Sequence, residues 1–162
     1  MKLPLSAVLT LLLAGFAGGQ NPGNQQPSVI MAPVGQVQLR AGASTNVEMA
    51  FRIGEGFHIN SSKPHSDFLI PTQLKLSVPP QVTLADVKYP AGKDESFPFS
   101  PNEQLSVYTG DFSIDAVLKT PAQATLGVYP VKGELTYQAC DKAACYPPKT
   151  LPVQFQVMIV KK

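Results

Sequence analysis

The only two cysteines of the chain, Cys140 and Cys145, lie in one short segment with four residues between them. Two thiols this close can form an internal disulfide and exchange it with the thiols of another protein. The loop between them is short, so a disulfide here would restrict the unfolded chain less than a long-range crosslink would. Stability is therefore a weak reason for the pair, and thiol–disulfide exchange is the leading hypothesis.

The cysteines have three further possible roles. A structural disulfide that pins a hairpin is the main alternative, since most disulfides of exported proteins are structural. A pair of free buried thiols would be unusual outside the cytosol. The only histidines, His58 and His65, are far from the cysteines in sequence, so the paired-ligand pattern of a zinc site is missing. We expect neither a metal nor a bound cofactor.

The N-terminal sequence indicates the compartment in which these cysteines are located. One basic residue, Lys2, precedes an apolar run over residues 3–17 and the small residues Gly18 and Gly19. This pattern is typical of a secretory signal peptide and is too short to favour a membrane span. We expect residues 1–19 to be a signal peptide and residues 20–28 a flexible leader. The mature chain is then soluble and periplasmic, or otherwise extracytoplasmic, where a disulfide can persist.

Composition limits the architecture and the partners. About 140 residues remain after the signal peptide, enough for one domain over residues 29–162. Of 13 basic residues one is Lys2, which leaves 12 against 11 acidic residues, and no basic run occurs before Lys161 and Lys162. Nothing therefore points to nucleic acid. The 16 prolines and 12 glycines are dispersed, which suits short strands joined by turns.

The hydrophobic pattern predicts strands throughout the mature chain. Residues 47–53, 74–78 and 153–157 alternate between apolar and polar side chains with the two-residue period of half-buried strands. Further strands are predicted near residues 37–39, 57–60, 82–89, 112–118, 124–129 and 133–139. Eight or nine short strands at about ten-residue spacing favour an all-β fold, an immunoglobulin-like antiparallel β-sandwich, with a small barrel as the alternative.

The predicted strands place the cysteines at a tight connection. Residues 133–139 form one strand and residues 149–157 the next, so Cys140 ends the first and Cys145 opens the approach to the second. Facing residues of an antiparallel pair can meet the α-carbon separation of roughly 4.4–6.8 Å that a disulfide requires. The following prolines, Pro147 and Pro148, are expected to end the ladder there.

The segment around the cysteines resembles the redox motif of the N-terminal periplasmic domain of DsbD, the thiol:disulfide interchange protein. Tyr137-Gln138-Ala139-Cys140 and Cys145-Tyr146-Pro147-Pro148 carry the resemblance, supported by segments 56–60, 68–72, 89–92 and 107–110 in the expected order. It covers roughly residues 30–160. The resemblance implies an immunoglobulin-like domain that takes electrons from a membrane-embedded thiol reductase and passes them to thioredoxin-like or other periplasmic thiol proteins.

The resemblance also implies roles for individual residues. Cys140 and Cys145 would form and resolve a mixed disulfide with the partner, and either Cys145 or else Cys140 would make the first attack. In related domains a short cap loop bearing an aromatic residue shields the pair. The corresponding region here is residues 93–100, in which Phe97 or Phe99 could be the shield; the alternative is that these rings anchor a loop on the core.

Four further residues are candidate neighbours of the sulfurs. His58 and Asn60 stand where the best-known member of the family has tyrosines near its pair. His58 is either a polar side chain on an outward strand face or a neighbour that tunes cysteine ionisation. Tyr137 and Tyr146 either flank the sulfurs or pack at the strand ends.

Two functions from different classes follow. Full-length family members continue into membrane spans and a thioredoxin-like domain, whereas this sequence ends at Lys162; we expect a stand-alone copy that depends on a separate membrane reductase. The rival is a non-catalytic immunoglobulin-like binding module with a structural hairpin disulfide. A hydrolase is disfavoured, because the sequence has no nucleophile elbow and no suitably spaced carboxylate pair.

Overall fold

The computed structural model describes residues 28–162, and every regular element in that range is a β-strand. The predicted signal peptide and nearly all of the predicted leader lie outside the described residues. None of the described residues forms a helix that could span a bilayer. The strands are β1 (Val29–Met31), β2 (Val37–Arg40), β3 (Ser44–Ile53), β4 (His58–Asn60), β5 (Gln73–Ser77), β6 (Thr83–Lys88), β7 (Lys93–Phe97), β8 (Ser100–Thr109), β9 (Asp111–Lys119), β10 (Gly127–Tyr137), β11 (Ala139–Cys140) and β12 (Lys149–Val160).

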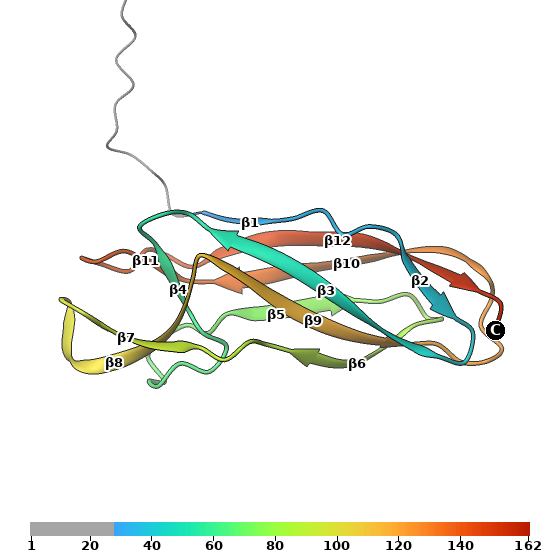
Figure 1. Cartoon of the computed structure of the whole chain (residues 1–162), viewed down its shortest axis with the longest axis horizontal. Helices are drawn as coiled ribbons and strands as arrows, with labels where there is room; N and C mark the ends of the chain where they lie inside the picture. Colours follow the sequence, from blue (N-terminus) through green and yellow to red (C-terminus); the bar gives the residue numbers. More distant parts are fainter. Residues whose placement is uncertain (1–27) are drawn as a thin grey trace, which may run out of the picture.

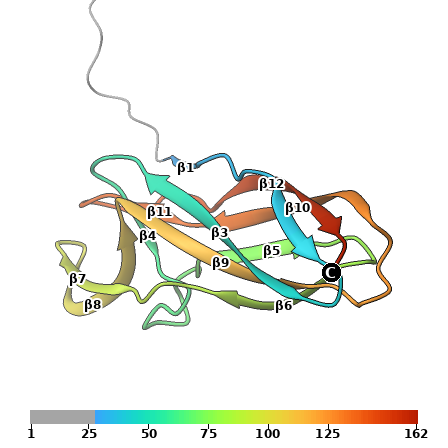
Figure 2. The same cartoon turned by 45° about the vertical axis from the view of Figure 1, so that its right-hand side comes forward.

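The strands form three four-stranded sheets. We call them sheet A (β1-β3-β9-β6), sheet B (β2-β12-β10-β5) and the end sheet (β11-β4-β8-β7). Sheets A and B lie against each other as the two layers of an elongated sandwich, and the end sheet lies at the end opposite the C-terminus (Figure 1 and Figure 2). All pairings between these strands are antiparallel except that of β2 with β12.

The hydrophobic core fills the space between the two layers. Along β3 every second residue from Val47 to Ile53 is buried, which is the alternation predicted from the sequence. Ile114 and Leu118 of β9 are fully buried beside them, and Leu135 of β10 and Val157 of β12 belong to the same cluster. The predicted immunoglobulin-like sandwich is confirmed.

Two parts of the predicted strand pattern were wrong. Residues 124–129 and 133–139 are not two strands, because β10 runs unbroken from Gly127 to Tyr137. β5 pairs only with residues 132–136 of β10, so Pro130 has no β5 residue opposite it. A proline, which has no backbone N–H to donate, is tolerated at such an unpaired position. The pattern also predicts no strand over residues 93–109, which form the hairpin of β7 and β8. The many charged and polar side chains of these two strands obscure the apolar–polar alternation by which a strand is recognised in sequence.

A close approach of backbones at Gly133 gives a first prediction. Gly133 lies in β10 opposite Leu76 of β5, and a Cβ atom there would overlap the Lys75 carbonyl oxygen and the Leu76 side chain. We expect Gly133→Ala to lower the free energy of unfolding by about 1–3 kcal/mol, because the strands must separate to admit the methyl group. Gly35→Ala is the control, since a Cβ there would meet no described atom within 4 Å. Equal denaturation midpoints for the two variants would contradict this prediction.

Candidate redox site

The two cysteines form a disulfide at the edge of the end sheet. Cys140 and Cys145 face each other in an isolated antiparallel bridge, as predicted, and their α-carbons are 3.9 Å apart, slightly closer than the expected range. Only Gln138 separates β10 from β11, yet the chain passes there from sheet B to the end sheet. Cys140 is therefore positioned by the end sheet, where it lies opposite His58 of β4.

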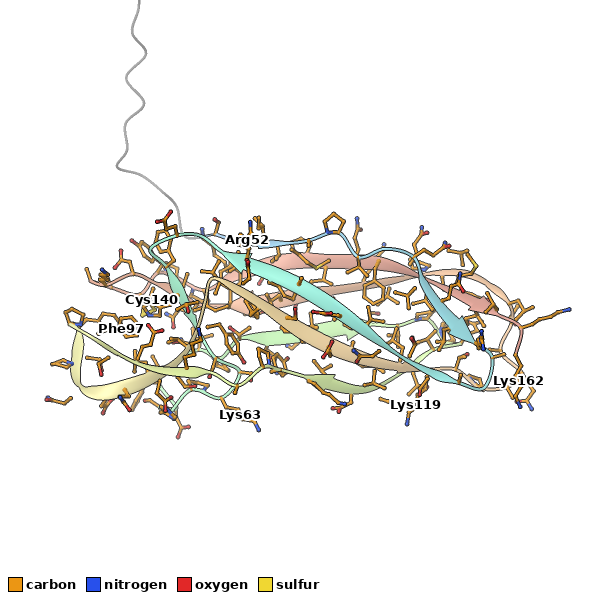
Figure 3. The ribbon with its side chains drawn as sticks, in the orientation of Figure 1. Arg52, Lys63, Phe97, Lys119, Cys140 and Lys162 are labelled. Carbon is orange, nitrogen blue, oxygen red and sulfur yellow. A yellow bond between two sulfur atoms is a disulfide. The ribbon has the colours of Figure 1, made fainter. Side chains whose placement is uncertain are left out.

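The two halves of the disulfide differ in exposure. Cys140 is 0% exposed, whereas Cys145 belongs to the exposed residues of the loop that follows. Figure 3 shows Cys140 at the same end of the sandwich as Phe97 of the β7–β8 hairpin. Cys145 is therefore the accessible half of the disulfide, while Cys140 is enclosed by the fold.

A single carboxylate organises the turn between the cysteines. Oδ1 of Asp141 accepts hydrogen bonds from the backbone N–H groups of Ala143, at 2.7 Å, and Ala144, at 2.9 Å. Its Oδ2 accepts a hydrogen bond from the Tyr146 hydroxyl at 2.6 Å. These bonds, that of Tyr146 first, lower the pKa of Asp141, and the same contact raises the pKa of Tyr146. Three hydrogen bonds of Asp141 thus hold the turn in addition to the sulfur–sulfur bond.

A chain of amide contacts connects this turn to β4. Asn60, fully buried, donates from Nδ2 to the Ile70 carbonyl at 3.0 Å and to Oε1 of Gln138 at 3.3 Å. Gln138 in turn donates from Nε2 to the carbonyl of Tyr146 at 3.2 Å, and the Tyr146 N–H donates to the Ala139 carbonyl at 2.8 Å. Asn60 therefore acts on the cysteine loop through Gln138.

His58 is enclosed in the protein. It is 3% exposed, so the expectation of an outward-facing polar side chain was wrong. Its ring stacks on that of Phe97, with centroids 3.9 Å apart, and its Nε2 atom has no hydrogen-bond partner among residues 28–162. Burial lowers the pKa of His58 to about 4, against the opposing effect of the Asp141 charge, so the imidazole is neutral at pH 7.

The predicted cap region comprises strand β7 and the turn into β8, and its Phe97 ring stacks on His58. Phe97 is 9% exposed and packs with Leu105, Val107 and Leu69 in a small hydrophobic cluster separate from the main core. Phe99 stacks on Phe97 with centroids 5.5 Å apart but remains 36% exposed. Of the two candidate shields, Phe97 is the buried one, and its ring lies against His58, the residue opposite Cys140.

The two tyrosines have different surroundings. Tyr137 is buried in the main core, where its hydroxyl accepts a hydrogen bond from the Val29 N–H at 3.3 Å. Tyr146 belongs to the cysteine loop and meets the ring of Phe57 edge-on, with centroids 5.9 Å apart. The first packs at a strand end, and the second is part of the site.

Sequence reasoning missed the structural roles of Asp141 and Gln138. An aspartate two and three residues before the small residues Ala143 and Ala144 is a pattern for a side chain that caps its own turn, and it could have been recognised. The position of Gln138 offered no such pattern, because one of its two contacts is with Asn60 of β4, nearly 80 residues away. Among the described residues, no group of three possible metal ligands is found.

Comparison with known proteins gives one family and several structural neighbours. The family model described as "Thiol:disulfide interchange protein DsbD, N-terminal" matches residues 27–156. The N-terminal periplasmic domain of ScsB from Proteus mirabilis is 11% identical with a TM-score of 0.52, over 83% of this chain and 48% of that one, so the chain spans about half of its length. No curated protein matches.

Two further solved structures are similar to this chain. The seventh ScaB type I cohesin from Pseudobacteroides cellulosolvens is 13% identical with a TM-score of 0.50, over 80% of this chain and 90% of that one. The reduced DsbD N-terminal domain from Neisseria meningitidis is 24% identical with a TM-score of 0.42, over 73% of this chain and 80% of that one. The ScsB and cohesin likenesses support the sandwich fold alone.

The turn held by Asp141 gives the second prediction. We expect Asp141→Ala to make the disulfide several-fold easier to reduce, because the loop loses three hydrogen bonds and holds the two thiols together less well. The measurement is the equilibrium constant with dithiothreitol, read by thiol alkylation. Lys142→Ala is the control, a truncation at the exposed next position. An equal effect of both substitutions would show that the Asp141 contacts do not preorganise the pair.

Proposed function

Since this chain belongs to the family of DsbD N-terminal domains, we propose that it is a thiol–disulfide exchange domain that works through Cys140 and Cys145. The observation that carries the proposal is the unequal exposure of the two cysteines. A disulfide with one accessible and one enclosed cysteine suits a reaction in which one sulfur meets the partner and the other resolves the product.

The exchange proceeds in two displacements. In the dithiol state the Cys145 thiolate attacks a disulfide of the partner, forms a mixed disulfide and releases one partner thiolate. Cys140, deprotonated, then attacks the sulfur of Cys145, closes the internal bond and expels the second partner thiolate. Two electrons pass to the partner, whose two thiolates take up the protons lost by the cysteines. The reverse sequence, with a dithiol donor, restores the reduced domain.

The family also supports a place for the domain in an electron path. We assign it to the periplasm, where a membrane-embedded thiol reductase supplies electrons and thioredoxin-like or other thiol proteins receive them. In this scheme Phe97 and the β7–β8 hairpin shield the enclosed side of the pair, on which His58 lies beside Cys140.

The rival function is a binding module whose disulfide only pins the loop. The contacts of Asp141 and Tyr146 weigh against it, because they already hold the turn that such a disulfide would pin. A very short loop also yields little stabilisation from a crosslink.

The third prediction separates these two functions by sulfur chemistry. We expect the Cys140–Cys145 bond to have a reduction potential well above about −300 mV, the level below which structural disulfides typically lie. Equilibration of the purified domain in dithiothreitol and glutathione buffers, with alkylation of free thiols, gives the value. A bond that resists both buffers would favour the binding module instead.

The fourth prediction concerns the order of attack. We expect Cys140→Ser, which keeps the exposed Cys145, to form a mixed disulfide with an aromatic disulfide reagent about tenfold faster than Cys145→Ser, since thiol exchange requires access to the sulfur. Stopped-flow absorbance measures both rates, and circular dichroism checks that both variants are folded. Faster reaction of Cys140 would reverse the assigned roles.

A further inference from the structure

His58 lies beside the enclosed cysteine but takes no part in the two displacements of the exchange. The strand register places His58 of β4 directly opposite Cys140 of β11. Directly opposed side chains of an antiparallel pair project from the same face of the sheet, with Cβ atoms about 4.5–5.5 Å apart. The other strand neighbour of His58 is Thr109 of β8, and Phe97 covers the imidazole ring.

One ring nitrogen of this imidazole is unsatisfied in the disulfide state. Its Nε2 atom is buried and, within the described chain, receives no hydrogen bond. A buried polar atom without a partner costs free energy, because the water it has lost is not replaced. Such atoms are rare in native structures, and some of them serve a redox or catalytic role.

Reduction of the disulfide supplies the missing partner. A disulfide sulfur carries no hydrogen, whereas a thiol has an S–H donor. When a dithiol donates two electrons and two protons, the sulfur–sulfur bond breaks, two S–H groups form, and the donor becomes a disulfide. One of the new S–H groups belongs to Cys140, opposite His58. The imidazole is neutral, as burial requires, and can accept its hydrogen bond.

We propose that His58 is a positioning residue for the exchange reaction: its Nε2 accepts a hydrogen bond from the Cys140 thiol in the dithiol state and thereby favours reduction of the disulfide. The inference rests on the proposed function for its biological meaning. Its physical basis is that His58 Nε2 gains a hydrogen-bond partner in the dithiol state, whereas this buried atom has none in the disulfide state. Asp141 is the charged group that acts on His58, and its negative charge increases the basicity of the imidazole.

The test compares substitutions that keep or remove the ring nitrogens. His58→Phe retains an aromatic ring to stack on Phe97 but has no acceptor, so we expect its disulfide to be about tenfold harder to reduce by dithiothreitol, equivalent to about 30 mV for a two-electron couple. His58→Gln keeps an acceptor and should recover part of this difference. His65→Phe is the matched control, because His65 is exposed and paired with Asp94; its equilibrium constant should equal that of the wild type.

A spectroscopic measurement keeps the proposal testable even if His58→Phe does not fold. In wild-type protein labelled with ¹⁵N in histidine, reduction should shift the Nε2 resonance of His58 in the direction expected of a new hydrogen-bond acceptor. The same resonance should not move when Cys140→Ala is treated with dithiothreitol. An unchanged Nε2 resonance in the wild type, or a folded His58→Phe that is as easily reduced as the wild type, would overturn the proposal.

These outcomes are distinguishable from failure of the proposed function. The dithiothreitol equilibrium and the ¹⁵N resonance require no protein partner. In one outcome the wild-type domain does not exchange with thiol proteins, while His58→Phe is still harder to reduce by dithiothreitol than the wild type. That result would refute the proposed function and retain the role of His58. If the wild type exchanges readily with thiol proteins and His58→Phe has the same dithiothreitol equilibrium constant as the wild type, only the role of His58 is refuted.

Discussion

The site depends on the short antiparallel pairing of β11 with β4. Two residue pairs, Ala139 with Ile59 and Cys140 with His58, attach the cysteine segment to the end sheet. Because side chains alternate along a strand, this register sends Ile59 and Ala139 into the main core and places Cys140 beside His58 on the other face. A shift by one residue would exchange the two faces and turn Cys140 into the core.

The two cysteines are positioned by different parts of the structure. Cys140 is held by the sheet, while Cys145 is held by a turn whose hydrogen bonds converge on Asp141. The sandwich core lies between sheets A and B and does not include either sulfur. Neither cysteine therefore contributes a side chain to the main core cluster.

The face of the end sheet that carries the site is polar and covered. His58 and Asn60 are buried there, and each retains one polar atom without a hydrogen-bond partner in the described structure, Nε2 and Oδ1 respectively. The aromatic ring of Phe97 covers that of His58, and Phe97 packs in a small hydrophobic cluster of its own. Buried polar groups of this kind reduce stability, and they are retained most readily where a reaction uses them.

Features that depend on local pattern could be predicted before the structure was known. The two-residue period identified β3 and β12, the spacing of Cys140 and Cys145 indicated their pairing, and the motif around them indicated the family. No local pattern indicates that Cys140 is enclosed and Cys145 exposed, that residues 93–109 form a hairpin, or that His58 is buried beneath Phe97; these features arise from the packing of the folded chain. The physical reason is that a disulfide across four residues is a local contact, whereas the burial of His58 requires Phe97 and Cys140, far along the chain from it, to pack around its ring.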